Sequence, residues 1–168
     1  SHNHPDHLHK ITLSYVRKNM LFLTPNFQSK STSKYLNSLG FKNIFCADFL
    51  KEYNFNKTNL NISILKSGDF RDDSGLYFSI GKFSCLFAVD SNSINYLRLP
   101  RVDLYACSFA GGASGFPLMF ENFNLKEKQQ LLNSSNKFFR LTRQKEIKKI
   151  KPKYFLPYAG FFTEKLKR

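Results

Sequence analysis

The sequence opens on Ser1-His2-Asn3-His4-Pro5-Asp6-His7-Leu8-His9, which holds all 4 histidines of the 168 residues. Neutral imidazoles and a carboxylate suit a borderline divalent ion such as zinc, but also iron or manganese, so the ligand types leave the element open. We expect His2 and His4 to hold one ion, and Asp6 and His7 a second, because two neighbouring ions can hold a hydroxide nucleophile and polarise the bond that it attacks. The competing interpretation is a set of polar residues at a frayed terminus.

Beyond this motif, the apolar pattern predicts a helix followed by a strand, a helix and a strand. Apolar residues in positions 8–16 recur at the spacing of one helical face. A short apolar run at 20–24 predicts a strand, and a helix at 31–39 is closed by Gly40 at its C′ position. The second strand is expected at 43–47.

The rest of the chain alternates strand and helix signals around polar loops. Strands are predicted at 60–65, 75–80, 83–89, 102–109 and 154–158. A tight hairpin at Gly81 joins the second of these strands to the third. A helical pattern begins at Asn124, which forms a capping-box-like pair with Glu127, and residues 133–136 are expected to break it into two helices. This order predicts an α/β fold with a mixed sheet, formed by residues 1–168 as one domain.

Composition favours a globular chain with an aromatic core. Hydrophobic residues make up 42% of the chain, including 19 Phe and 8 Tyr, and no apolar run approaches the ~18 residues of a membrane span. Cys46, Cys85 and Cys107 each lie in an apolar, strand-like run, which favours core residues over a disulfide or a thiolate metal site. We therefore expect a reducing compartment, the cytoplasm.

The positive charge is concentrated in the C-terminal part. The chain has 26 basic and 12 acidic residues, and positions 126–168 contain 13 of the basic and 3 of the acidic ones. A solvated helix face is one interpretation, and a surface that attracts phosphates or nucleic acid is the other. No base-stacking or phosphate-loop motif accompanies these residues, which disfavours nucleic acid as a partner.

Three stretches resemble known families. The opening motif resembles the signature loop of the metallo-β-lactamase fold, in particular the branch with ascorbate-6-phosphate lactonase and N-acylphosphatidylethanolamine phospholipase D. The other two stretches resemble segments of the CMP-N-acetylneuraminate hydroxylase family, which makes the glycolyl form of CMP-sialic acid. They are Val102-Asp103-Leu104 through Phe109-Ala110-Gly111-Gly112-Ala113-Ser114-Gly115-Phe116-Pro117, and Pro152-Lys153-Tyr154-Phe155-Leu156-Pro157-Tyr158-Ala159-Gly160-Phe161-Phe162.

The resemblance extends, with gaps, from Ser1 to about Glu164. It implies a metallo-β-lactamase-like αββα four-layer sandwich that is truncated at the N-terminus, so that the chain is a fragment. It also implies that His2, His4, Asp6 and His7 are the first ligand group, and that Asp90 at the end of a strand is the bridging carboxylate. The resemblance further implies that Asp6 and Asp90 are catalytic residues.

This sequence departs from the family pattern at two ligand positions. Families of this fold usually supply a further histidine between the two motifs and one before the last glycine, whereas no histidine follows His9 here. Asp69 is the substitute ligand that we expect, and Tyr158 takes the aromatic position that the hydroxylase family also has. A second ion should then be held weakly. Asp72 and Asp73 are interpreted as residues that solvate or cap the loop.

The loop at 111–117 has two interpretations, a tight turn that needs glycine and a set of backbone N–H groups that face an anionic ligand. Its close resemblance to the hydroxylase family favours substrate contacts. The substrate-binding residues that we expect are Gly112, Ser114, Gly115 and Tyr158.

The resemblance also implies cofactors and a function. The expected cofactors are one or two divalent metal ions, zinc or iron, with manganese as a further option. A Rieske [2Fe–2S] centre needs paired cysteines and histidines, and it would have to lie upstream of Ser1. We expect an enzyme that acts on a nucleotide sugar or a related phosphorylated small molecule. The alternatives are a hydrolase of phosphodiester, phosphate-ester or lactone bonds, a catalytically degenerate scaffold, and an RNA-processing protein.

Overall fold

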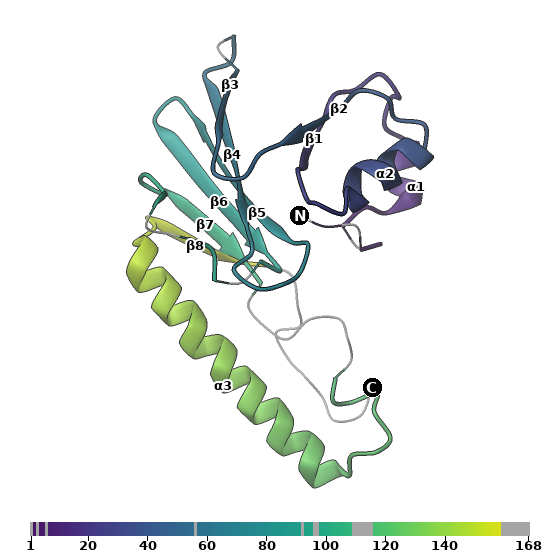
Figure 1. The fold of residues 1–168 in the computed structure, drawn as a ribbon. Coiled ribbons are helices and arrows are strands. Elements are labelled where there is room, and N and C mark those ends of the chain that lie inside the picture. Colours follow the sequence, from purple (N-terminus) through teal and green to yellow (C-terminus); the bar gives the residue numbers. More distant parts are fainter. Residues whose placement is uncertain are drawn as a thin grey trace.

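The computed structural model describes residues 2, 4–5, 7–55, 57–91, 93–95, 98–108 and 116–158. These residues form three helices and eight strands (Figure 1). In chain order the elements are α1 (Lys10–Ser14), β1 (Phe22–Pro25), α2 (Ser31–Ser38), β2 (Ile44–Ala47), β3 (Glu52–Phe55), β4 (Leu60–Lys66), β5 (Ser74–Ile80), β6 (Phe83–Val89), β7 (Leu104–Cys107), α3 (Leu125–Ile150) and β8 (Tyr154–Pro157).

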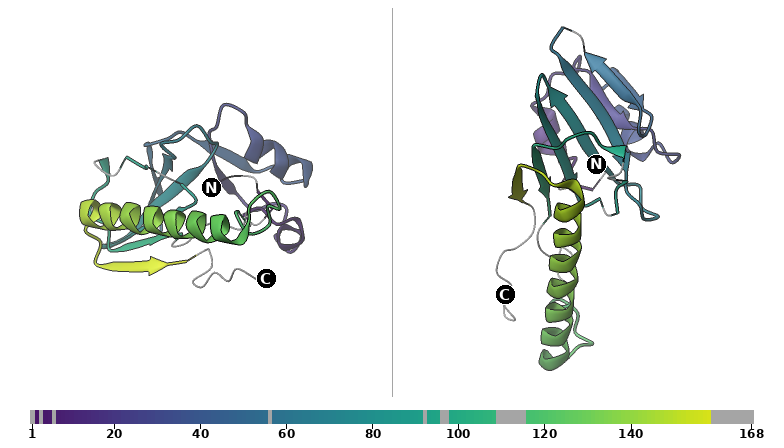
Figure 2. Two further views of the ribbon diagram at one scale, coloured as in Figure 1. Left: turned by 90° about the horizontal axis from the view of Figure 1, so that it is seen from below. Right: turned by 90° about the vertical axis from the view of Figure 1, so that its left-hand side faces the viewer.

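The elements are arranged in layers around two sheets. Strands β3 to β8 form a six-stranded sheet, and β1 and β2 form a separate parallel pair. Helix α3 lies on one side of the large sheet, and the β1–β2 pair with α1 and α2 lies on the other, as Figures 1 and 2 show. The order helix, sheet, sheet, helices is that of the expected αββα sandwich, with two strands in the second sheet of the described part of the chain.

The six strands of the large sheet follow one another in sequence order. β3 to β6 are antiparallel, whereas β6, β7 and β8 run parallel, so the sheet is mixed as predicted. The β5–β6 hairpin pairs Ile80 with Phe83, and Gly81 between them has a φ of 57°, a left-handed conformation that glycine adopts without a steric penalty. As a result β4, β6, β7 and β8 all end at the same edge of the sheet, where β5 begins.

Two apolar clusters hold the layers together. The larger one lies between the large sheet and the C-terminal end of α3, where Ile147 and Ile150 pack against residues such as Tyr77, Leu86 and Tyr105. The smaller one, formed by Leu13, Leu36 and Phe41, packs α1 and α2 on the β1–β2 pair. Each cluster buries the apolar side chains on one face of its helices and strands, because removing apolar surface from water is favourable.

The end of α2 shows how the sequence fixes the crossover between β1 and β2. The N–H of Gly40 donates to Asn37 O and the N–H of Phe41 donates to Leu36 O, a Schellman motif. Gly40 has a φ of 87°, the left-handed conformation that this motif requires. The prediction of a helix closed by Gly40 is confirmed.

Three details differ from the sequence prediction. Helix α3 is continuous through residues 133–136, because Gln129 Nε2 donates to Asn133 Oδ1 one turn away and the Asn124–Glu127 capping box secures the helix start. Strand β3 was not predicted. Helix α1 is short, and its buried residue is Leu13, whereas Ile11 and Tyr15 of the predicted apolar face are exposed.

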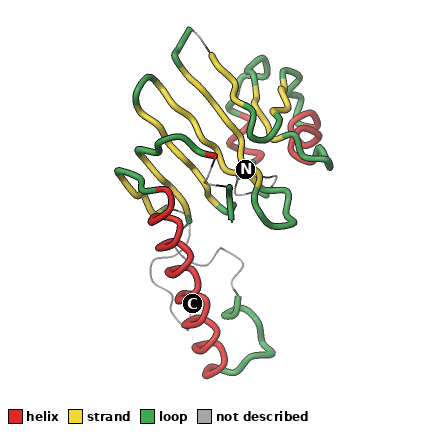
Figure 3. Tube along the Cα trace, turned by 60° about the vertical axis from the view of Figure 1, so that its left-hand side comes forward, coloured by secondary structure: helices red, strands yellow, loops and turns green. Residues whose placement is uncertain are grey.

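A buried polar cluster ties α3 to β7. Arg143 Nε donates to the carbonyl oxygen of Ser108 at 2.8 Å, and its Nη1 pairs with Glu146. The Tyr105 hydroxyl donates to the same Glu146 carboxylate at 2.8 Å. Arg143 is 3% exposed and Glu146 5%, so the two charges are satisfied by each other and not by water. Figure 3 shows that the rest of α3 extends beyond the sheet. None of the described helices is long and apolar enough to cross a membrane.

This cluster gives a stability prediction. Replacing Arg143 with Met leaves the Glu146 carboxylate buried without its cation, so we expect the free energy of unfolding to fall by about 3–5 kcal/mol. Urea denaturation measures the change. Arg140→Met on the exposed side of the same helix is the control, with an expected effect within about 0.5 kcal/mol. Equal stabilities for the two variants would contradict the importance of the buried pair.

Candidate metal centre

The candidate site lies at the edge of the large sheet where β6, β7 and β8 end. Ligands of open α/β sheets bind at this type of edge because side chains from several strand ends converge there. The N-terminal segment brings His2 and His7 to the edge, and Asp90 follows β6 directly. The loop between β4 and β5 supplies Asp69 and Asp73 from the other side.

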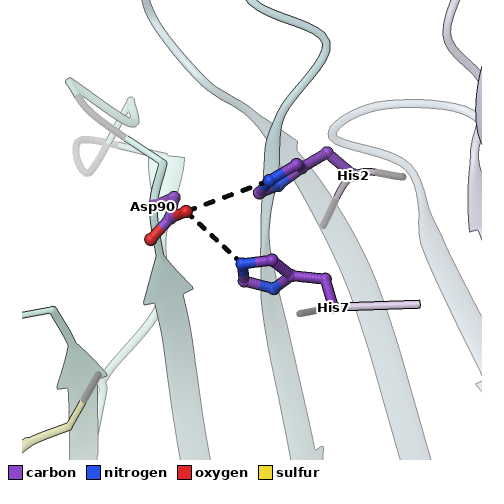
Figure 4. Close-up of side chains that lie close together, drawn as sticks. All are labelled: His2, His7 and Asp90. Carbon is purple, nitrogen blue, oxygen red and sulfur yellow. Dashed lines mark ion pairs between the residues drawn. The ribbon is translucent and has the colours of Figure 1, made fainter. Parts of the chain in front are cut away.

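Three side chains from distant parts of the sequence meet at this edge. His7 Nε2 is 3.3 Å from Asp90 Oδ2, and His2 Nε2 is 3.9 Å from the same oxygen (Figure 4). One donor atom from each of these residues lies within 4.8 Å of the other two, a spacing that could hold a metal ion. His2 is buried, and the other two are half-buried.

The buried carboxylate of Asp73 fixes the orientation of His2. His2 Nδ1 is 3.1 Å from Asp73 Oδ1, and the N–H of Ser74 donates to the same oxygen at 2.7 Å. A bond at Nδ1 leaves Nε2 as the nitrogen that faces Asp90. Burial lowers the pKa of His2 even though the Asp73 carboxylate opposes this shift. The neutral imidazole, which is the form that binds metals, is therefore favoured near neutral pH.

The backbone around Asp90 departs from a regular strand. Between Phe87 and Val89 the register of β6 against β7 shifts, and Val89 has a φ of 45°. A β-branched residue rarely adopts this left-handed conformation, which is found where the surrounding structure overdetermines it. The N–H of Ser108 donates to Val89 O, and the N–H of Ser91 donates to Ala88 O. This bulge turns the Asp90 side chain out of the strand and toward the histidines.

The structure places the other predicted residues in different surroundings. His4 is exposed, and its ring packs edge-on against the ring of His2 with centroids 4.2 Å apart. Asp69 is paired with Arg71 and is not part of the three-residue cluster. Burial opposes ionisation of Asp69, but hydrogen bonds from Arg71 outweigh it and lower the pKa of this carboxyl. The following predicted residues lie outside the described part of the chain: Asp6, Gly112, Ser114 and Gly115.

Tyr158 lines a cavity that is also lined by His2 and His7. The cavity has a volume of about 360 Å³ and lies between the large sheet and the β1–β2 pair, with mostly apolar walls such as Leu76 and Phe87. Burial raises the pKa of Tyr158 to about 12, with a further contribution from nearby negative charge. The phenol is therefore protonated at neutral pH and can donate a hydrogen bond to a ligand in the cavity.

The donors in this cluster fit one divalent cation. Two imidazole nitrogens and one carboxylate oxygen are a set that non-haem iron sites and zinc sites both use. The second oxygen of Asp73 is buried and has no hydrogen-bond partner among the residues that the structure describes. Burial of a carboxylate oxygen without a partner costs free energy unless positive charge is close by. A cation bound to His2 would supply that charge.

Sequence reasoning missed the role of Asp73. It was interpreted as a residue that solvates or caps the loop, but it is 2% exposed and bonded to His2. The one signal in the sequence is that the polar loop at 67–73 leads directly into the apolar β5, which puts its last residue at the sheet edge. Nothing in the local pattern indicates a partner 71 positions away.

Solved structures with a similar fold carry hydroxylase names. A variant of the CmlA β-hydroxylase superposes on 95% of this chain with a TM-score of 0.69 and 24% identity, and the chain covers 35% of it. CmlA from Streptomyces venezuelae, described as a diiron β-hydroxylase, gives a TM-score of 0.67 at 21% identity. YhfI from Bacillus subtilis, a metallo-β-lactamase fold protein, superposes more weakly, with a TM-score of 0.48. The chain therefore shares the mixed α/β fold of the CmlA hydroxylase structures.

The sequence is similar to CMP-N-acetylneuraminic acid hydroxylases. The protein of that name from Danio rerio is 32% identical over 98% of this chain, and the one from Pan troglodytes is 33% identical over 63%. A human relative with 33% identity over 63% of the chain is described as inactive. The chain spans 29% of the length of the Danio rerio relative. No model of a known protein family matches the chain.

The first prediction for the site concerns the three donors. Replacing His2 or Asp90 with Ala removes one of three ligands, so we expect the affinity for Co²⁺ to fall by more than about tenfold. A titration followed by visible absorption measures it. His9→Ala is the matched control, because His9 is exposed and bonded to Thr12. Loss of binding in the His9 variant, or normal binding in the Asp90 variant, would contradict the proposed ligand set.

The second prediction concerns the support of His2. Asp73→Asn keeps the size of the side chain but removes the negative charge beside the ring, so we expect the affinity for Co²⁺ to fall by about 10- to 100-fold. Asp72→Asn is the control, since Asp72 is exposed and accepts a hydrogen bond from Ser29. The same titration would show equal affinities for both variants if Asp73 had no influence on the site.

Proposed function

We propose that this protein is a metal-dependent hydroxylase that acts on a nucleotide sugar or a related phosphorylated small molecule. The observation that carries the proposal is the cluster of His2, His7 and Asp90 at the mouth of a mostly apolar cavity. Iron oxygenases use two imidazoles and one carboxylate when further coordination positions stay open. Zinc hydrolases use similar sets, so the donors alone do not decide between the two chemistries.

The relatives favour hydroxylation over hydrolysis. CmlA is named a diiron β-hydroxylase, and the sequence relatives are named hydroxylases of CMP-N-acetylneuraminic acid. We propose iron as the metal for this reason. In this protein, His2, His7 and Asp90 would hold it. An iron ion at this position supplies the redox chemistry that hydroxylation of a C–H bond with dioxygen requires.

The surrounding residues have separate tasks in this proposal. Asp73 keeps the Nδ1 side of His2 occupied, so that Nε2 faces Asp90. The apolar walls of the cavity exclude water from the reacting group of the substrate. The protonated phenol of Tyr158 donates a hydrogen bond that orients the substrate. The net charge of +14 draws an anionic phosphorylated substrate toward the protein.

A product assay tests the proposal. The protein is loaded with iron(II) and supplied with dioxygen, a chemical reductant and CMP-N-acetylneuraminic acid. We expect mass spectrometry to show a product heavier by one oxygen atom, which comes from labelled dioxygen. Asp90→Ala should lose the activity because it removes a ligand, and His9→Ala should retain it.

Other outcomes separate the alternatives. Release of CMP, or opening of a phosphodiester or lactone in suitable substrates, without oxygen incorporation would contradict hydroxylation and support a hydrolase. Binding of iron without any product would favour the degenerate scaffold.

A further inference from the structure

Arg71 connects the loop between β4 and β5 to the backbone of Asp90. Its Nη2 donates to the carbonyl oxygen of Asp90 at 2.8 Å. The two residues are 19 positions apart and lie on different elements. This bond acts on the backbone of the candidate ligand residue itself.

Asp69 holds the guanidinium of Arg71 in place. Arg71 Nε and Nη2 both donate to Asp69 Oδ2, at 2.9 and 2.8 Å, and the backbone N–H of Arg71 donates to Oδ1 at 3.1 Å. A planar guanidinium bonded in this forked way loses its rotational freedom. The pair is partly exposed, with 42% of the Arg71 side chain accessible, so its contribution to global stability is small.

The turn at Asp90 needs such a support. Val89 is in a left-handed conformation that is sterically unfavourable for a β-branched residue. Without external bonds, this residue would relax toward the extended conformation and rotate the peptide that follows it. The Asp90 side chain would then turn away from His7, whose Nε2 lies 3.3 Å from its carboxylate.

We infer that Asp69 and Arg71 are positioning residues, which hold the Asp90 turn in the conformation that presents its carboxylate to His2 and His7. The inference rests on the proposed metal site. It assigns Asp69 a role through Arg71 in place of the direct ligand role that the sequence predicted. Loss of either residue loosens the turn without removing a donor from the cluster.

A double-mutant cycle tests the inference with Co²⁺ affinity as the readout. We expect Arg71→Gln to weaken binding by about 10-fold or more, and Asp69→Asn to weaken it by less. If Asp69 acts on the site through Arg71, the double variant should bind as tightly as Arg71→Gln alone. Arg71→Lys should not restore binding, since a single ammonium cannot reproduce the fork to Asp69 and the bond to Asp90.

Arg101→Gln is the matched control. Arg101 is an exposed arginine that also pairs with a carboxylate, Asp103, but neither belongs to the cluster. Its loss should leave Co²⁺ affinity unchanged. Additive losses in the cycle would identify Asp69 as a direct ligand and overturn the inference. So would a fall in the melting temperature of the metal-free Arg71→Gln protein large enough to explain the weaker binding.

Hydrogen exchange provides a readout that does not need metal. The amide of Ser91 donates to Ala88 O in the same turn. In metal-free protein, Arg71→Gln should accelerate exchange in peptides that contain this amide, while Arg101→Gln should not. Unchanged exchange overturns the inference. If the wild-type protein bound no metal at all, the proposed function would fail, but faster exchange would still support the positioning role.

Discussion

The contact between His2 and Asp73 joins the N-terminal segment to the six-stranded sheet, and the geometry of the site depends on it. Both side chains are almost fully buried, with 8% and 3% of their surfaces accessible. A carboxylate in such surroundings requires hydrogen-bond partners, and it has the His2 ring and the Ser74 amide. Because Asp73 occupies Nδ1, the remaining nitrogen of His2 is directed at Asp90. The orientation of the donor thus comes from a residue that need not touch the metal.

The other half of the site depends on how β6 ends. A regular strand would continue past Val89 with its side chains alternating between the two faces of the sheet. The shift in register and the left-handed residue interrupt this alternation where the parallel neighbour β7 also ends. The protein thus stores backbone strain beside the candidate ligand and offsets it with hydrogen bonds from Ser108 and Arg71. Ser108 is in turn bonded to Arg143, so α3 supports the same edge from the opposite side of the sheet.

Local sequence signals predicted much of the fold. The glycine that closes α2, the Gly81 hairpin and the Asn124 capping box each depend on residues a few positions apart, and each is present in the structure. The continuity of α3 was missed because asparagine and serine favour helix ends in general, whereas here Asn133 is bonded within the helix. β3 has only four residues, and one alternation of two polar and two aromatic side chains is too short to predict a strand.

The candidate site was harder to predict from local sequence signals than the fold. The family resemblance pointed to His2, His4, Asp6, His7 and Asp90 as ligands. Of these, the structure brings His2, His7 and Asp90 together, and Asp6 lies outside the described residues. The partners that orient them, Asp73 and Arg71, come from a polar loop whose residues look interchangeable in the sequence. Burial distinguishes Asp73, which is 2% exposed, from Asp72 beside it, which is exposed. Burial of a loop residue is decided by tertiary packing, which a single sequence does not contain.

The sequential order of the strands has a consequence for how the molecule forms. Neighbours from β3 to β6 are also neighbours in the chain, so their pairing closes short loops and loses little chain entropy. The histidines must instead reach a partner 71 positions away. We therefore expect the sheet to fold first and the candidate metal site to be assembled late. A nascent chain would then have a finished scaffold before the residues of the candidate site come together.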